Sequence, residues 1–271
     1  MRVVRLLLGL LTVVVFVLSL PACTKTSTEN GSGMDSAVMW AKYAAEYQAI
    51  SAQVYAQATR DLPRLLAEES WSAVPGHEGE TDKPPAIILD VDETVLSNVD
   101  FQLHLEGSYT SLKHYEWTNS NIAIPLRGAA DFVAFARSAG VEIFFVTNRM
   151  CEKIEGNDDV CPQEKSTIGD IQEVGIDVDV DHVLLANEKP DWGKEKLVRR
   201  EHVAKTHRII MLFGDDYGDF VACTRAVPVA PCTARATRAS RAAALDTYQD
   251  YWGNGWYILP NPMHGSWTSV R

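Results

Sequence analysis

Three apolar runs, each followed at once by polar residues, constrain the fold of this 271-residue chain more than any other feature. They cover residues 85–89, 141–146 and 208–213, and each has the length and composition of a buried strand. Segments with a helical period separate them. Strands that alternate with helices form a parallel sheet with right-handed crossovers. The sequence therefore predicts an α/β fold with a doubly wound parallel sheet.

The other predicted elements fit between these runs. The segment 97–125 is polar, carries scattered aromatic residues and lacks β alternation, so we expect a small helical cap insertion over the sheet edge. In the predicted helix over residues 128–138, Phe132, Val133 and Phe135 would face inward. Further helices are expected over residues 37–69, 163–174 and 194–205, and a further strand over residues 183–185.

Polar side chains stand just past three of the predicted strands. Asp90 and Asp92 follow the first, Thr147 follows the second, and Asp215 follows the run 208–213. The carboxyl ends of parallel strands meet at one edge of a sheet, where ligands bind. One carboxylate can attack a substrate while the other moves protons. Aspartates at strand ends are also common as turn and cap residues, so the D-x-D-x-T pattern alone leaves both interpretations open.

The four candidate parts match the needs of phosphoryl transfer, where catalysis is mostly positioning and charge stabilisation. Thr147 supplies a hydroxyl group, and a lysine, Lys194 or Lys196, supplies a point positive charge. Asp215 supplies a hard oxygen ligand of the kind that Mg²⁺ prefers. The pattern favours a metal-dependent phosphatase with one Mg²⁺ per chain.

The order and spacing of these parts resemble the haloacid-dehalogenase (HAD) superfamily, and within it the class C acid phosphatases and lipoprotein 5′-nucleotidases. The resemblance covers nearly all of the chain after the leader, and it implies a HAD-like Rossmannoid domain over residues 37–271. It is carried by the blocks I-L-D-V-D-E-T-V-L-S-N (88–98), F-F-V-T-N-R (144–149), D-W-G-K-E-K (191–196), R-R-E-H-V-A (199–204), G-D-D-Y-G-D-F (214–220) and L-P-N-P-M-H-G-S-W (259–267).

The resemblance implies a role for each matching residue. Asp90 would be the nucleophile that forms an aspartyl-phosphate, and Asp92 would be the general acid and base. Asp90, the backbone carbonyl of Asp92 and Asp215 would bind the metal. Thr147 and a lysine would hold the phosphoryl oxygens, and the spacing favours Lys196 over Lys194. Metal-bound water would be ordered by Asp216 and Asp219, and substrate would be bound by Thr94, Asn148, Arg149, Trp117 and His264.

The chain departs from the family pattern at His264, where the family usually has tyrosine. The resemblance implies that this position and an aromatic residue of the cap stack on a nucleobase. A histidine stacks less broadly, and the cap block is shortened around Trp117. The choice between 5′-nucleotides and small organic phosphates as substrates therefore stays open.

The N-terminus has the parts of a secretory signal peptide. Arg2 and Arg5 precede an apolar run over residues 6–20, which is short for a membrane-spanning helix. The residues before Cys23 resemble a bacterial lipobox, so we expect a signal peptide over residues 1–22 and a lipid on Cys23, with simple cleavage as the alternative. A polar tether would follow over residues 23–36. The expected location is outside the cytoplasm, lipid-anchored at the outer membrane or periplasmic.

Four cysteines remain beside Cys23. In an exported protein an even set favours disulfides, and the nearest pairs are Cys151–Cys161 and Cys223–Cys232. No C-x-x-C pattern supports the competing zinc site.

The net charge of −11, from 25 basic and 36 acidic residues, disfavours a nucleic-acid polymer or an anionic membrane surface as partner. The sequence leaves the oligomeric state open. We therefore expect an exported phosphoric monoester hydrolase, an acid phosphatase, that acts on small phosphorylated substrates. The alternatives are a phosphotransferase with the same intermediate and a surface lipoprotein that binds a ligand without turnover.

Overall fold

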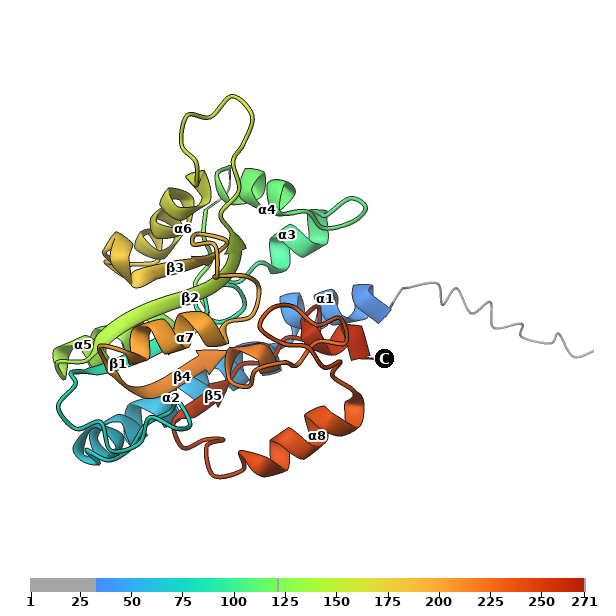
Figure 1. The fold of residues 1–271 in the computed structure, drawn as a ribbon. Coiled ribbons are helices and arrows are strands. Elements are labelled where there is room, and N and C mark those ends of the chain that lie inside the picture. The colour runs from blue at the N-terminus through green and yellow to red at the C-terminus, as the bar shows by residue number, and fades with distance from the viewer. Residues whose placement is uncertain (1–32, 121, 271) are drawn as a thin grey trace, which may run out of the picture. The chain divides into compact units, whose positions relative to one another are not determined.

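The computed structural model describes residues 33–120 and 122–270, which form a five-stranded, all-parallel sheet with helices on both sides (Figure 1). The strand order is β3-β2-β1-β4-β5. The strands are β1 (Pro85–Leu89), β2 (Glu142–Met150), β3 (Val183–Ala186), β4 (Arg208–Gly214) and β5 (Trp256–Ile258). The predicted α/β class with a parallel sheet is confirmed.

The predicted signal peptide, Cys23 and the predicted tether as far as residue 32 lie outside the described residues. Within the described part of the chain, no helix is both long enough and apolar enough to span a membrane.

The central position of β1 brings the polar strand ends together. It pairs with β2 on one side and with β4 on the other. Leu89, its last residue, lies opposite Phe145 of β2 and Phe213 of β4. The residues that come after Leu89, Phe145 and Phe213 therefore lie side by side at this edge of the sheet.

One face of the sheet packs against α2 (Ala45–Ala67) and α5 (Ala129–Ser138). Tyr55 of α2 stacks on Phe213 of β4, with ring centroids 5.4 Å apart, and Phe132 of α5 lies against both rings. Phe132 and Val133 are buried as expected. The prediction for Phe135 was wrong, because its side chain is 38% exposed on the outer side of α5.

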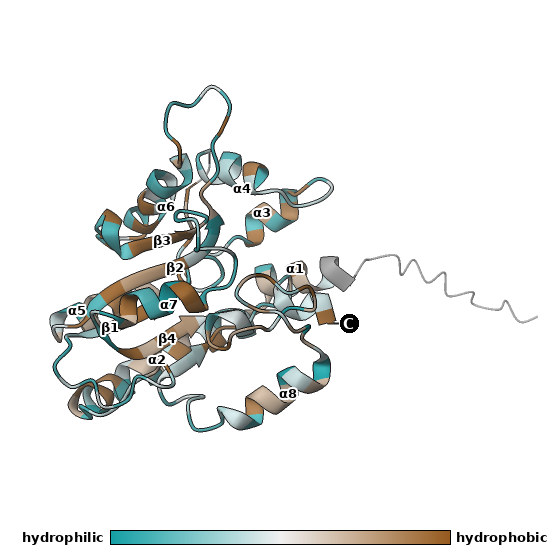
Figure 2. Cartoon of the chain, in the orientation of Figure 1, coloured by the Kyte–Doolittle hydropathy of each residue, from teal (hydrophilic) through white to brown (hydrophobic). Residues whose placement is uncertain are grey.

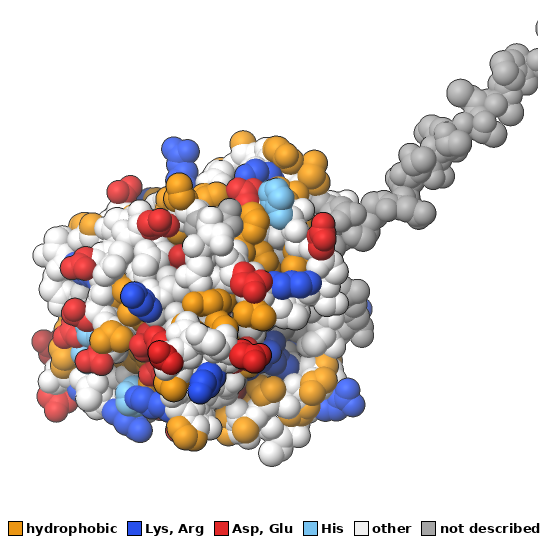
Figure 3. Space-filling view, turned by 90° about the horizontal axis from the view of Figure 1, so that it is seen from above, with side chains coloured by type: hydrophobic (Ala, Val, Ile, Leu, Met, Phe, Trp, Pro, Cys, Tyr) orange, Lys and Arg blue, Asp and Glu red, His pale blue; other side chains and the backbone are white. Residues whose placement is uncertain are grey.

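The other face packs against α7 (Leu197–Ala204) and a group of aromatic residues near the C-terminus. Alternate residues of β1 serve the two faces, since Ile87 and Leu89 join the first core and Ala86 and Ile88 the second. The strands are accordingly the most hydrophobic segments in Figure 2. Figure 3 shows acidic, basic and hydrophobic side chains interspersed on the face seen from above.

Two elements on this second side were not predicted. The strand β5 has three residues, too few for a readable period, and it pairs with β4 beside Leu212. The helix α8 (Arg238–Thr247) buries none of its residues, so it shows no apolar stripe. Its N-terminus is held by Thr237, whose side chain accepts a hydrogen bond from the Ser240 N–H in a capping box.

The predicted first helix is two helices. The helix α1 (Gly33–Tyr43) begins inside the predicted tether, and α2 begins after Ala44, whose backbone is extended. The cap region holds α3 (Val99–His104) and α4 (Ser111–Thr118), and α4 packs against α6 (Pro162–Glu173).

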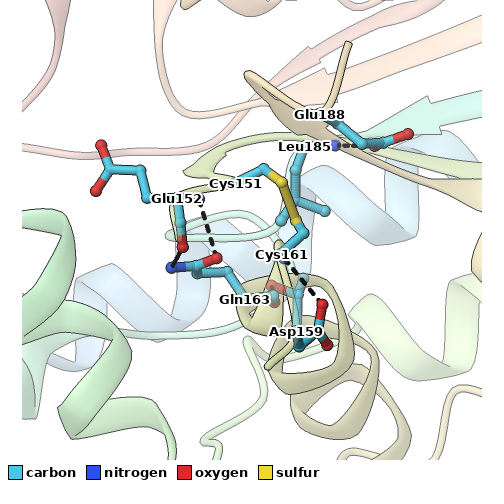
Figure 4. Close-up of a disulfide and its surroundings, with 8 residues drawn as sticks. Cys151, Glu152, Asp159, Cys161, Gln163, Leu185 and Glu188 are labelled. Atoms are coloured by element: carbon cyan, nitrogen blue, oxygen red, sulfur yellow. Dashed lines mark hydrogen bonds between the residues drawn. A yellow bond between two sulfur atoms is a disulfide. The ribbon is translucent and has the colours of Figure 1, made fainter. Parts of the chain in front are cut away.

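The strand β2 is longer than expected and continues through Thr147 to Met150. It ends where Cys151 forms a disulfide with Cys161, which closes the following loop (Figure 4). Gln163 holds the base of this loop, because its side chain bonds to both the N–H and the carbonyl of Glu152. Thr147 therefore lies inside a strand and not past its end.

Candidate active site

Three carboxylates meet at the carboxyl edge of the sheet. Asp90 follows β1, and its N–H donates to the carbonyl of Phe213 in β4 at 3.0 Å. Asp215 follows β4, and Asp219 lies in the short 3₁₀ helix η2 (Tyr217–Asp219) after it. Single oxygens of Asp90, Asp215 and Asp219 all lie within 4.8 Å of one another. These residues could hold a metal ion.

Gly214 makes this close approach possible. A Cβ atom at this position would lie 2.1 Å from the Oδ2 atom of Asp219, so any other residue would push that carboxylate away. The same Oδ2 atom accepts a hydrogen bond from the N–H of Asp216 at 2.9 Å. Steric exclusion by Asp219 therefore explains why the G-D-D motif begins with glycine.

Lys196 neutralises part of this negative charge. Its Nζ atom lies 2.6 Å from Asp90 Oδ1 and 2.5 Å from Asp219 Oδ1, and its side chain is 4% exposed. Lys196 immediately precedes α7, whereas Lys194 is exposed to solvent. The geometry thus brings Lys196, and not Lys194, to the carboxylates.

One lysine does not balance three carboxylates. Burial raises the pKa of Asp90 to about 7, against the opposing effect of Lys196, and the charges of Asp219 and Asp92 raise it further. Desolvation also raises the pKa of Asp215 well above its ordinary value, with added repulsion from Asp219 and Asp90. A cluster of this kind attracts a cation, and its all-oxygen donors suit a hard divalent ion.

Asp92 has a different environment. Its carboxylate accepts hydrogen bonds from Arg149 Nη2 at 2.8 Å and from Asn98 Nδ2 at 2.8 Å. Burial opposes ionisation of Asp92, but the charges of Arg149 and His114 outweigh it and hold the pKa of Asp92 well below its usual range. The Arg149 guanidinium is also bonded to Asp170 of α6. Arg149 also lines the cavity, and its predicted contact with substrate stays a prediction.

A chain of hydrogen bonds links the C-terminal block to the catalytic motif. The Asn261 amide donates to Asp215 Oδ2 at 2.7 Å and lies 3.2 Å from His264 Nδ1. The Nε2 atom of His264 lies 3.1 Å from Oε2 of Glu93, which is fully buried and has φ of 57°. Glu93 in turn accepts from the N–H of Asn98 at 2.6 Å. Asn261 and Asn98 thus orient Asp215 and Asp92.

These two asparagines stand within the motif blocks that carry the family resemblance, but nothing in their type or spacing marked them. Asp170 carries no sequence signal, because it lies inside α6 and outside all of the motif blocks.

A cavity of about 850 Å³ opens over these groups. The predicted site residues that line it are Asp90, Asp92, Asn148, Arg149, Lys196, Asp215, Asp216, Asp219 and His264. The Asn148 side-chain carbonyl accepts from Arg199 at 2.7 Å, which leaves its amide hydrogens as donors. Residues that the sequence did not single out complete the walls: Val38 and Met39 of α1, Leu103, Leu105 and Tyr109 of the cap region, and Arg225.

Three predicted site residues are not part of the cavity wall. Thr94 is fully buried and directs its hydroxyl toward Asp215 Oδ1 at 3.5 Å. Thr147 is also fully buried, and its hydroxyl accepts from the N–H of Arg149 at 3.1 Å. Trp117 packs against Phe101 and His104 within the cap region. Tyr109 supplies the aromatic side chain that the cap contributes to the cavity.

A second disulfide, between Cys223 and Cys232, lies beside the site. The carboxylate of Glu195, the neighbour of Lys196, accepts from the N–H of Cys223 at 3.1 Å. The loop that this disulfide closes is therefore tied to the segment that carries Lys196.

Known proteins are similar to this chain in both sequence and fold. A family model described as HAD superfamily, subfamily IIIB (Acid phosphatase) matches residues 21–267. Two solved structures of the class C acid phosphatase from Bacillus anthracis, one with tungstate bound, are each 30% identical in sequence. In each case the match covers 86% of this chain and 86% of that chain, with TM-scores of 0.67 and 0.68. The resemblance found in the sequence is confirmed.

The buried contacts of Lys196 predict a difference from Lys194. Lys196→Met removes the cation between Asp90 and Asp219, and we expect the free energy of unfolding to fall by about 3–5 kcal/mol, because the remaining charges lose their partner. Lys194→Met is the matched control and should change it by no more than about 0.5 kcal/mol. Denaturant titration of both variants at neutral pH measures the difference. Equal stabilities would contradict the structural role of Lys196.

Proposed function

The chain belongs to the subfamily IIIB acid phosphatases of the HAD superfamily, and from this membership we propose that it hydrolyses phosphomonoesters through an aspartyl-phosphate on Asp90. It is a phosphomonoester hydrolase that acts on small phosphorylated substrates. The observation that carries the proposed mechanism is the pair of unlike aspartates. Asp90 lies beside Lys196, whereas Asp92 lies beside Arg149.

In the proposed first step, a carboxylate oxygen of Asp90 attacks the phosphorus atom and the bond to the leaving alcohol breaks. Asp92 gives its proton to the leaving oxygen. In the second step Asp92 takes a proton from water, the water oxygen attacks the phosphorus, and the Asp90–phosphate bond breaks to release phosphate. Lys196 and the Asn148 amide would stabilise the charge on the phosphoryl oxygens. Thr147 would act through Arg149, because the Thr147 hydroxyl accepts a hydrogen bond from the Arg149 N–H.

A metal ion fits the donor set. We propose that Asp90 and Asp215, with the backbone carbonyl of Asp92, hold one Mg²⁺, and that Asp216 and Asp219 orient its water ligands. The excess of carboxylates over Lys196 and the raised pKa of Asp215 support a cation here. When bound, Mg²⁺ would offset negative charge on the phosphoryl group.

The cavity supports a substrate larger than phosphate alone. Its apolar residues, among them Val38, Leu103 and Leu105, suit the carbon skeleton of a leaving group, and Tyr109 and His264 offer aromatic rings. These contacts are compatible with 5′-nucleotides and with other organic phosphates.

Substitution of the two aspartates tests the mechanism. Asp90→Asn should lower hydrolysis of p-nitrophenyl phosphate by at least about a thousandfold, since it removes the nucleophile. Asp92→Asn should lower hydrolysis of a poor leaving group, such as glycerol 3-phosphate, by about 10²–10⁴. Arg149 lowers the pKa of Asp92, so the acid form of Asp92 becomes more populated as pH falls, while bound Mg²⁺ would keep Asp90 ionised. With Mg²⁺ present, the wild-type rate should therefore be higher at acidic than at alkaline pH.

Asp181→Asn, at an exposed position, is the control for both variants and should keep wild-type rates. Full activity of Asp90→Asn, or a wild-type rate that climbs steadily toward alkaline pH, would refute the mechanism.

Metal binding has a readout that does not depend on turnover. Mg²⁺ should raise the melting temperature of the wild-type protein, because a ligand at 100 times its Kd stabilises the folded state by about 2.7 kcal/mol. Asp215→Asn should lose this shift, while Asp181→Asn should keep it. A shift of the same size in Asp215→Asn would place the ion elsewhere.

We also propose export and a lipid on Cys23, outside the described residues. The basic start, the apolar run and the lipobox-like residues before Cys23 support this, as do two disulfides, which persist in oxidising compartments. Mass spectrometry of the protein from a bacterial membrane fraction should find a diacylglyceryl group on Cys23. A mature chain with unmodified Cys23 would argue for simple cleavage.

A further inference from the structure

The cavity contains one basic side chain that the proposed reaction does not use. Among the described residues that line it, five carry basic groups, and four of them have partners. Lys196 pairs with Asp90 and Asp219, and Arg149 pairs with Asp92 and Asp170. The rings of His114 and His264 bond to Asn98 and to Glu93. The fifth is Arg225.

No hydrogen bond or ion pair reaches the Arg225 guanidinium from any other residue of the described chain. Burial opposes ionisation of Asp216, but hydrogen bonds from Ser266 and Gly218 lower the pKa of its carboxyl, and the charge of Arg225 adds a smaller effect through space. The Asp216 oxygens are already engaged, since they accept from the N–H groups of Gly218 and Ser266. Arg225 is therefore a partly buried cation with five unused donors at the wall of the cavity.

The backbone of Arg225 is fixed by its neighbours, although no other described residue bonds to its side chain. The disulfide between Cys223 and Cys232 closes the loop that carries it, and its carbonyl accepts from the N–H of Ala236 at 3.0 Å. The preceding residue, Thr224, is buried, and its carbonyl accepts from Arg241 at 2.8 Å. A guanidinium on a fixed base is preorganised to receive a ligand, which lowers the entropic cost of binding.

We propose that Arg225 binds a second anionic group, a carboxylate or a phosphate, on the leaving group of the substrate. The proposal rests on the proposed function, because the scissile phosphoryl group would lie at Asp90 and Lys196, which line the same cavity. A guanidinium matches the two oxygens of either anion with parallel hydrogen bonds. The other cations of the cavity are committed, so a second anion has Arg225 as its available partner among the described wall residues. The enzyme would prefer phosphomonoesters whose leaving group is itself charged.

Matched pairs of sugar phosphates test this preference. Sorbitol 6-phosphate and 6-phosphogluconate, both open chains, differ by a carboxylate, and fructose 6-phosphate and fructose 1,6-bisphosphate differ by a phosphate. For the wild-type protein we expect kcat/KM to be about tenfold or more higher for the charged member of at least one pair, since one charged hydrogen-bonded contact is worth about that factor. The pair that shows the higher kcat/KM for its charged member identifies the anion that Arg225 binds as a carboxylate or a phosphate.

Arg225→Gln should abolish the preference in the carboxylate pair. In the fructose pair it should leave only the advantage that comes from the two hydrolysable phosphates of fructose 1,6-bisphosphate. The change should appear in KM and not in kcat. Arg225→Lys should restore part of the preference, because a point charge remains without the fork of donors. Arg238→Gln is the matched control, as Arg238 lines a separate cavity on the adjacent α8, and it should keep the wild-type ratio. An equal loss in Arg238→Gln would mean a long-range charge effect and would overturn the proposal.

Two further outcomes overturn it. One is a wild-type protein that shows no preference in either pair. The other is an Arg225→Gln variant that lowers kcat/KM for both members of a pair by the same factor, as a structural role would. Binding of the four compounds to Asp90→Asn, measured by calorimetry, separates this inference from the proposed function. If the wild-type protein hydrolyses no ester, the ratio of Kd values with and without Arg225 still decides where the second anion binds.

Discussion

The repulsion among Asp90, Asp215 and Asp219 is the constraint on which the rest of this site depends. Carboxylates that lie within 4.8 Å of one another at the edge of a sheet cost free energy unless a cation offsets them. Lys196 supplies one positive charge from the segment before α7. What remains is a site that favours a divalent cation or an uncharged carboxyl, and the raised pKa values of Asp90 and Asp215 express the same imbalance.

The fold creates this crowding and also limits it. Asp90 and Asp215 come together because β1 and β4 are neighbours in a parallel sheet. Asp219 approaches them because Gly214 has no Cβ. Asp92, two residues after Asp90, is drawn toward Arg149 and away from the cluster, so two aspartates of one motif meet opposite electrostatic surroundings. These surroundings raise the pKa of Asp90 and lower that of Asp92, so a cation bound beside Asp90 would be needed to keep it ionised for the proposed attack.

The segments outside the sheet decide what the site can accept. The cavity is bordered by apolar residues of α1 and the cap region, by the ring of Tyr109, and by Arg225, which has no partner among the described residues. None of these residues has a role in the proposed reaction. The disulfide between Cys223 and Cys232 fixes the loop that carries Arg225 and holds the segment next to Lys196 through Glu195. The proposed anion-binding residue Arg225 and the buried Lys196 are therefore held by the same disulfide-closed loop.

The sequence by itself determined the α/β class, the family, and Asp90, Asp92 and Asp215 as residues at one sheet edge. It could do so because buried strands are continuous apolar runs and because parallel strands direct their ends to one side. Only the tertiary structure decided that Lys196 and not Lys194 reaches the carboxylates, that Arg149 pairs with Asp92 and Asp170, and that Trp117 lies away from the cavity. It also revealed β5, α8 and an Arg225 side chain to which no other residue of the described segments bonds. The physical reason is that periodicity reports which side of an element is buried, whereas pairing between distant side chains depends on how the elements pack.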